Sequence, residues 1–100
     1  ERSFSVGAPD TGNTIKLYTT EIDGARNVGG RESLAGQLGS IKPVEQTLLL
    51  NLDSLGIPLD NVEGMTFGPN LADGRRSLVL VSDNNFAPAQ FTQFLLFALD

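Results

Sequence analysis

The segment from Leu59 to Phe86 reads LDNVEGMTFGPNLADGRRSLVLVSDNNF and contains two runs that are typical of β-strands. The first run, Gly64–Gly68, is short and bounded by glycines. The second, Ser77–Ser82, is apolar at every inner position, as in a strand that is buried on both faces. Asp73-Gly74 between the runs is a strong signal for a tight turn. The segment therefore predicts an antiparallel hairpin, with acids and amides crowded before its first strand and after its second.

Three further runs outside this hairpin also suit strands, because they are rich in β-branched, alternating leucine or aromatic residues: Thr14–Ile22, Thr47–Leu52 and Gln90–Leu99. Glu1–Ser5 is expected to be the end of another strand on the blade layout described below. Periodicity alone would also allow buried helices at Leu48–Leu50 and Phe94–Leu99. The clusters of Gly, Pro, Asn and Asp between the runs favour strands instead. The sequence therefore predicts an all-β chain.

A weak internal repeat indicates how these strands are grouped. Residues 1–23 and 82–100 each open with charged or amide residues and a phenylalanine, pass through a Pro-containing turn, and end in an amphipathic strand followed by aspartate. Repeats of about 40–50 residues with several strands apiece are typical of β-propellers, which are built from four-stranded antiparallel blades. A β-sandwich is the alternative that the same pattern allows.

On the propeller interpretation, the chain is a C-terminal fragment of about one and a half blades. Residues 1–52 form the end of the penultimate blade, with an irregular glycine-rich insertion at 24–43. Residues 60–100 form the first three strands of the last blade. We therefore expect the chain to be part of a longer protein, whose remaining blades are its partners.

Composition excludes several classes of function. The chain has 100 residues, seven Lys and Arg against twelve Asp and Glu, and a net charge of −5 without any basic cluster, which disfavours nucleic-acid binding. Because it contains no cysteine and no histidine, it cannot hold a disulfide, a thiolate metal site or a complete Ser-His-Asp triad. No apolar run approaches the roughly 18 residues of a transmembrane helix, and no signal-peptide pattern is present.

The acids and amides of the opening segment predict a cation site. In a meander, alternate connections lie on the same face, so the residues before the first hairpin strand and those after the second should meet near Glu1 and Arg2. Two carboxylates about 4 Å apart repel by about 1–4 kcal/mol, and a bound cation offsets this repulsion. Oxygen donors without His or Cys favour a divalent metal such as Ca²⁺.

We assign the carboxylates Asp60, Glu63 and Asp83 as metal ligands. The residues expected to orient the substrate or the ligands are Arg2, Asn61, Asn84 and Asn85. Asp and Asn are also common in turns, where they hydrogen-bond to their own backbone. The sequence leaves both interpretations of these residues open. Glu63 fits the turn interpretation least, because glutamate before glycine is no particular turn former.

Taken together, these motifs resemble the C-terminal part of proteins of the esterase-like phytase family. Members of this family are bacterial β-propeller proteins with phosphatase or esterase-like activity. The matching elements are Asp60-Asn61-x-Glu63-Gly64, Phe67-Gly68-Pro69, Asp73-Gly74-Arg75-Arg76 and Ser82-Asp83-Asn84-Asn85-Phe86, followed by QFLLFAL. The resemblance covers Pro43–Leu99, is weaker over Glu1–Ala25, and is absent across the glycine-rich middle.

This resemblance implies a protein of several hundred residues, often exported to the periplasm or the exterior, that acts on a phosphoester or another ester. Similar propellers place metal ions at the mouth of the central channel, where Glu63 and Asp83 fall in this layout. Three functions compete: a metal-dependent hydrolase, a non-catalytic propeller that binds calcium or a partner, and a lactonase-type hydrolase. The fragment alone is expected to be inactive, because most of the site would lie in other blades.

Overall fold

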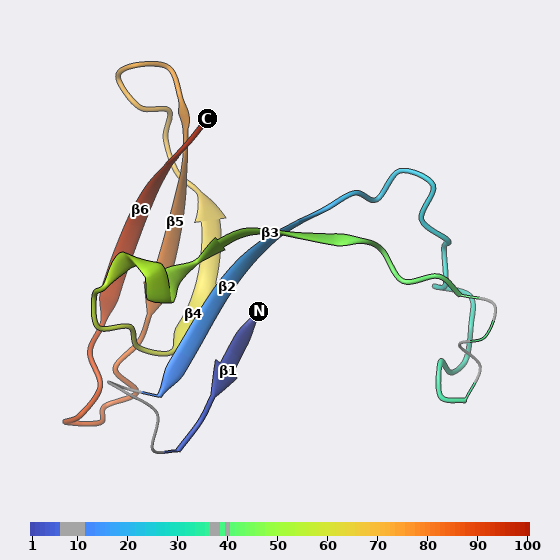
Figure 1. Ribbon diagram of the computed structural model, residues 1–100, viewed down its shortest axis with the longest axis horizontal. Coiled ribbons are helices and arrows are strands. Elements are labelled where there is room, and N and C mark those ends of the chain that lie inside the picture. Colours follow the sequence, from blue (N-terminus) through green and yellow to red (C-terminus); the bar gives the residue numbers. More distant parts are fainter. Residues whose placement is uncertain (7–11, 37–38, 40) are drawn as a thin grey trace.

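The computed structural model describes residues 1–6, 12–36, 39 and 41–100 (Figure 1). In this part of the chain it has six strands and one short 3-10 helix: β1 (Arg2–Phe4), β2 (Asn13–Thr20), β3 (Gln46–Asn51), η2 (Leu52–Leu55), β4 (Val62–Phe67), β5 (Arg76–Ser82) and β6 (Gln93–Leu99). The predicted all-β fold is confirmed, and strands occupy the core of each predicted run. None of the described helices has the length and hydropathy of a membrane span.

The strands form two three-stranded antiparallel sheets, with the orders β1-β2-β3 and β4-β5-β6. The predicted hairpin is present, with Met65 of β4 opposite Leu80 of β5. Strands β2 and β3 also pair, with Leu17 opposite Leu50. Each sheet follows the chain as an up-and-down meander. This arrangement is consistent with two incomplete blades of a propeller.

Strand β6 begins three residues later than the sequence predicts, and the reason is tertiary. Two successive turns precede it, in which Ala87 N donates to Asn84 O at 2.7 Å and Gln90 N donates to Ala87 O at 3.0 Å. The next amide, Phe91 N, donates to the carboxylate of Asp60 at 2.7 Å. Since this amide is already bonded outside the ladder, regular pairing with β5 starts only at Gln93.

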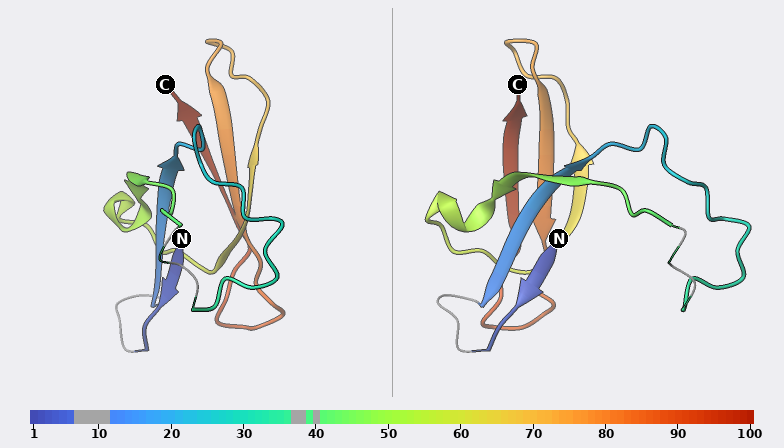
Figure 2. Two further views of the ribbon diagram at one scale, coloured as in Figure 1. Left: turned by 90° about the vertical axis from the view of Figure 1, so that its right-hand side faces the viewer. Right: turned by 45° about the vertical axis from the view of Figure 1, so that its right-hand side comes forward.

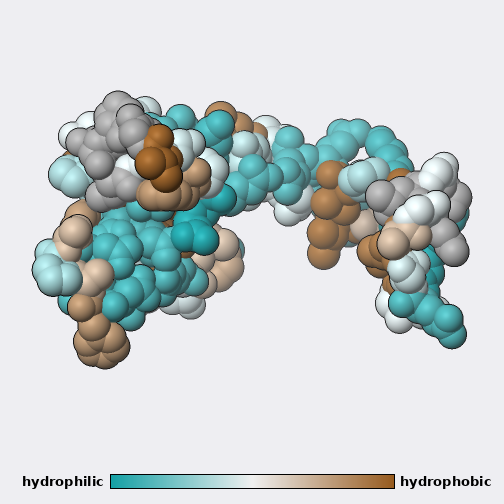
Figure 3. Space-filling model, turned by 90° about the horizontal axis from the view of Figure 1, so that it is seen from below, coloured by the Kyte–Doolittle hydropathy of each residue, from teal (hydrophilic) through white to brown (hydrophobic). Residues whose placement is uncertain are grey.

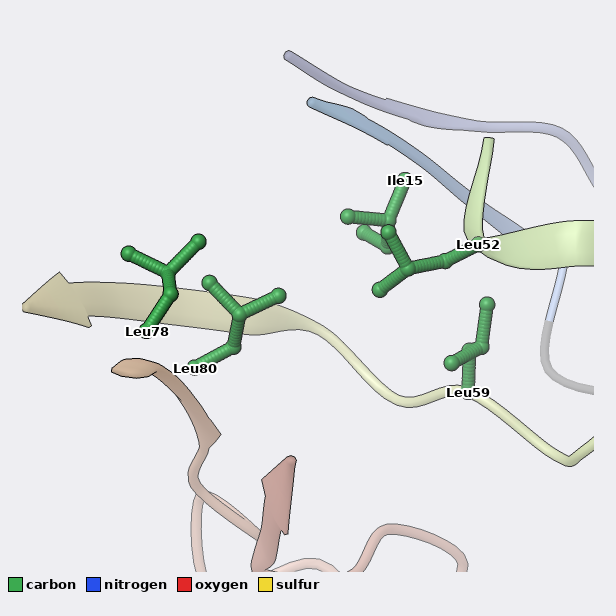
Figure 4. Packing of buried hydrophobic residues seen from close by; sticks show 5 residues of the cluster. All are labelled: Ile15, Leu52, Leu59, Leu78 and Leu80. Carbon is green, nitrogen blue, oxygen red and sulfur yellow. The ribbon is translucent and has the colours of Figure 1, made fainter. Parts of the chain in front are cut away.

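The two sheets share one small core of five buried apolar residues: Ile15, Leu52, Leu59, Leu78 and Leu80. Figure 4 shows Leu78 and Leu80 pointing from β5 toward Ile15 and Leu52. Leu52 reaches this core because it opens helix η2, which the sequence analysis did not predict. The side chain of Asn51 accepts a hydrogen bond from Asp53 N at 3.1 Å at the start of η2, and Gly56 ends it at a φ of 63°.

The connection between β2 and β3 extends away from both sheets as a long arm (Figures 1 and 2). Its described residues contain turns and bends but no strand. Ala25 N donates to Ile22 O at 3.0 Å, and Arg31 N donates to Val28 O at 3.0 Å. The shape of the described part of the arm is therefore set by local turns, because its sequence lacks the periodic apolar pattern that a strand or helix would bury.

The chain exposes more surface than its mass requires. Its accessible surface is 7544 Å², whereas a compact protein of 10.7 kDa exposes about 5,500 Å². The radius of gyration is 17.1 Å, against about 13 Å for a compact domain of this length. Part of the excess is apolar, because Phe94 and Leu96 on β6 and Met65 on β4 are mostly exposed. Large parts of both sheets therefore lack the covering that a complete fold would supply.

We predict that the isolated 100-residue chain associates through β6 rather than remaining a monomer, because this edge strand is apolar. Phe94→Lys should reduce the association, because Phe94 is 71% exposed on β6. Ile22→Lys, at a residue 70% exposed outside the strands, is the matched control and should not. Light scattering after size exclusion measures the mass, and a monodisperse monomer that unfolds cooperatively would contradict the prediction.

The β4–β5 turn is held by one charged pair. The Asp73 carboxylate accepts hydrogen bonds from Arg75 N at 3.1 Å and from Arg75 Nε at 2.8 Å, and Gly74 turns the backbone with a φ of 87°. Arg75 also pairs with Asp100 at 3.2 Å. The side-chain hydrogen bond from Arg75, followed by the backbone one, lowers the pKa of Asp73 below its ordinary value of 3.8. Deprotonated Asp73 is therefore favoured in the folded turn.

This lowered pKa predicts a pH dependence. Because the folded pKa of Asp73 lies below the unfolded one, its contribution is fully present above about pH 4 and is lost as the pH falls through the folded value. Asp73→Asn should therefore be less stable than the wild type above pH 4, and the difference should shrink toward pH 2. The effect should be small and weakened by salt, since the pair is exposed. Melting temperatures between pH 2 and 6 measure it, and a difference independent of pH would refute it.

Candidate functional site

The register of the second sheet places both polar segments at one end. Val62, at the start of β4, pairs with Ser82, at the end of β5. Asp60 and Asn61 before β4, and Asp83, Asn84 and Asn85 after β5, therefore lie at the same end of the sheet, and Glu63 is the second residue of β4 at that end. The Asp73–Arg75 turn lies at the opposite end, because β4 and β5 are antiparallel.

Three of the predicted site residues form a chain of hydrogen bonds between the sheets. The Arg2 guanidinium donates from Nη1 to Asn61 Oδ1, and Asn61 Nδ2 donates to Glu63 Oε1 at 2.5 Å. Only this orientation of the amide satisfies both neighbours, because guanidinium is solely a donor and carboxylate solely an acceptor. Arg2 belongs to β1 and Glu63 to β4, so the Arg2–Asn61–Glu63 chain joins the two sheets.

Asp60 lies outside this chain, although it is adjacent to Asn61. It is 1% exposed, whereas Glu63 is exposed. Its carboxylate accepts hydrogen bonds from Asn61 N and Phe91 N, both at 2.7 Å. The structure thus separates two acids that look equivalent in the sequence, one buried against backbone amides and one at the surface.

The predicted residues on the β5–β6 loop make local turn contacts. Asn84 Oδ1 accepts from Phe86 N at 3.2 Å, and Asn85 Nδ2 donates to the backbone carbonyl of Asp83 at 3.3 Å. Asp83 itself is exposed. The turn interactions that the alternative interpretation expects are therefore present at Asn84 and Asn85, and their role toward a substrate stays a prediction.

Phe86, the next residue, also belongs to the surface of this loop, which its sequence context did not predict. Asn85 and Phe86 have φ values of 48° and 55°, a left-handed conformation that is unusual for an aromatic residue. Phe86 is 99% exposed, so burial does not compensate the strain. The hydrogen bonds of Asn84 hold the backbone in this shape. The motif Asn-Asn before an aromatic was the available signal, because asparagine tolerates the left-handed region.

Two open cavities border the Arg2–Asn61–Glu63 chain. One, of about 400 Å³, lies between the sheets and is lined by Arg2 and Glu63 together with core residues such as Ile15 and Leu80. The other, of about 440 Å³, is lined by Arg2, Phe4, Asn13, Asp60, Asn61, Ala89 and Gln90. Figure 3, a view from below, shows hydrophilic residues over the middle of the body. A small polar molecule could reach Arg2 from either cavity.

The described residues contain no group of three or more Asp, Glu, His or Cys side chains placed to hold a metal ion. The predicted ligands Glu63, Asp83 and Asp60 therefore do not form a complete site within this part of the chain. Carboxylate and amide oxygens are nevertheless the donors that Ca²⁺ prefers. The calcium site stays a prediction.

The strained loop generates a stability prediction. Phe86→Gly should raise the free energy of unfolding slightly, by less than about 1 kcal/mol, because relief of a strain of about 1–2 kcal/mol exceeds the entropic cost of glycine. Phe4→Gly is the control, because Phe4 lies in β1 and its loss should destabilise. Urea unfolding measures both variants in the intact protein. Destabilisation by Phe86→Gly would show that the ring makes a contact that outweighs the strain.

Comparison with protein families identifies relatives of this chain. A family model, Phytase-like, described as esterase-like activity of phytase, matches residues 1–86. The match runs through the glycine-rich arm and includes the Arg2–Asn61–Glu63 chain and the loop up to Phe86, whereas β6 lies beyond it. Curated proteins and solved structures gave no match. Because the matched region covers most of the sequence, the chain belongs to the Phytase-like family.

Proposed function

We propose that this chain is part of a metal-dependent hydrolase that acts on phosphoesters or other esters. The observation that carries the proposal is the convergence of Arg2, Asn61 and Glu63 at the end of the sheet where the register also places Asp83. Membership of the Phytase-like family supports this class of chemistry. An anion-binding guanidinium beside exposed carboxylates is the combination that an ester or phosphoester site needs.

Glu63 and Asp83 are the residues that would hold the ion. Both are exposed, and only one oxygen of Glu63 is hydrogen-bonded within the described chain, so carboxylate oxygens remain available to a ligand. Their like charges repel at short range, and a divalent cation would offset this repulsion. With oxygen donors alone, calcium is the ion we propose. Blades outside this chain would supply the remaining ligands.

The other residues bind and orient the substrate. Arg2 would contact an anionic oxygen of a phosphoester through its remaining guanidinium donors. Asn61 holds the Arg2 guanidinium and the Glu63 carboxylate in fixed positions relative to each other. Asn84 and Asn85 stand on the loop that leaves the same end of the sheet. When bound, a divalent ion polarises a phosphoryl or carbonyl oxygen and lowers the pKa of a coordinated water.

Glu63→Gln in the intact protein tests the proposal, because it removes a charge and nearly keeps the shape. We expect calcium affinity to fall about tenfold or more, in line with the loss of one charged ligand, and phosphoester turnover to fall with it. Asp73→Asn is the matched control, since it removes a carboxylate at the opposite end of the same hairpin. Calorimetry measures binding, and a panel of phosphoester, carboxylic ester and lactone, with and without chelator, measures turnover.

The outcomes separate the three functions. Reduced binding together with reduced turnover supports the hydrolase, and the panel shows whether the substrate is a phosphoester, another ester or a lactone. Reduced binding with full turnover would mean a structural ion. No turnover on any substrate would favour a non-catalytic propeller. If Glu63→Gln changes neither quantity, Glu63 does not belong to the site.

A further inference from the structure

The buried carboxylate of Asp60 joins two segments that are far apart in sequence. Its Oδ1 accepts from the backbone N of Asn61 at 2.7 Å and from Gln90 Nε2 at 3.3 Å, and its Oδ2 accepts from the backbone N of Phe91 at 2.7 Å. Asn61 lies just before β4, whereas Gln90 and Phe91 close the loop before β6. One side chain thus holds the β3–β4 connection against the β5–β6 loop.

A carboxylate that is 1% exposed is stable only if its charge is met by donors. Here both oxygens are met, and charge-assisted hydrogen bonds of this kind are stronger than neutral ones. Two of the three donors are backbone amides, which cannot turn away. Coordination of a cation would compete with these bonds, so the contacts of Asp60 favour a role different from that of the metal ligand expected from the sequence.

A second set of polar contacts fixes the same junction. Ser82, also 1% exposed, donates from Oγ to Phe91 O at 3.2 Å and accepts from Gln93 N at 3.2 Å. Gln93 Nε2 donates to Pro58 O at 3.2 Å. The end of β5, the start of β6 and the β3–β4 connection are therefore linked by hydrogen bonds, and the loop that begins with Asp83 follows directly after Ser82.

We propose that Asp60 is a positioning residue. Its buried carboxylate sets the location of the β5–β6 loop, which carries Asp83, Asn84 and Asn85, relative to Glu63. Glu63 lies in β4 and Asp83 follows β5, and the ladder between these strands ends at the Val62–Ser82 pair. Beyond that pair, the position of the loop that begins with Asp83 depends on contacts outside the ladder. The connection to ion binding rests on the proposed function. The fixing of the loop does not, and it can be measured in the metal-free protein.

Asp60→Asn in the intact protein tests this inference. The new amide has one oxygen and one NH2 group, so its NH2 group must face at least one of the backbone N–H groups that now donate to the carboxylate. Ser77→Ala is the matched control, since Ser77 is as buried as Asp60 but lies in β5 and donates to Pro69 O at 2.6 Å, at the opposite end of the sheet. In the metal-free protein, Asp60→Asn should speed hydrogen exchange of the Phe91 amide about tenfold or more. Ser77→Ala should leave it within about twofold.

A distance measurement gives the position of the loop directly. Spin labels attached through Thr66→Cys on β4 and Phe86→Cys on the loop, both exposed sites, report the separation between β4 and the loop. Asp60→Asn should broaden the distribution of this distance, and Ser77→Ala should not. An unchanged distribution together with unchanged exchange at Phe91 would overturn the proposal.

Calcium affinity, measured at a temperature where both variants are folded, then separates positioning from general destabilisation. Asp60→Asn should weaken calcium binding about tenfold, and Ser77→Ala should not, even if both lower the melting temperature equally. Weaker binding with normal exchange and distance would instead identify Asp60 as a ligand. If the wild type binds no calcium and turns over no ester, the proposed function fails, while exchange and distance still decide whether Asp60 fixes the loop.

Discussion

The Asp60 carboxylate connects more of this structure than any local motif does. It is buried, yet each of its oxygens accepts hydrogen bonds from N–H groups, and the donors come from segments about 30 residues apart. Since a buried charge must keep such partners, the β3–β4 connection and the β5–β6 loop cannot separate without loss of stability. The start of β6, the turn before it and the polar end of the second sheet all depend on this interaction.

Among the described residues, a small apolar core and the Arg2–Asn61 hydrogen bond connect the two sheets. Ile15 and Leu52 from the first sheet and η2 meet Leu78 and Leu80 from the second. Above this core, Arg2 reaches Asn61 across the junction. The predicted ligand Glu63 is connected to the first sheet through the same amide. A change in how the two sheets pack would therefore also move the candidate site.

The strands could be predicted from the sequence because their signals are local: apolar periodicity, β-branched residues and turn residues at fixed positions. The late start of β6 could not, because it depends on a hydrogen bond between Phe91 and a residue 31 positions away. The helix η2 was missed for a different reason. Its apolar residues continue the leucine run of β3, and only the cap at Asn51 and the glycine at 56 mark the change of structure.

The candidate site was predicted in outline, as a set of acids and amides at one end of a hairpin. Their separate roles depend on burial, which composition does not reveal. Asp60 and Glu63 are both acids before the same strand, but one accepts backbone hydrogen bonds inside the protein and the other is exposed. Asn61 faces Arg2 and Glu63, whereas Asn84 and Asn85 stabilise their own loop. Residue type suggested metal ligation for the three acids and an orienting role for the amides, and three-dimensional context distinguishes residues within each group.

The proposed function requires the end of the second sheet that carries Glu63 and Asp83 to bind a divalent cation. Anomalous diffraction from crystals of the intact protein grown with calcium, or with a heavier ion in its place, tests this claim most directly. We expect an ion within about 2.3–2.6 Å of oxygens from both Glu63 and Asp83, with Asp60 still bonded to the amide of Phe91. An ion bound elsewhere, or one held by Asp60 in place of that amide, would contradict it.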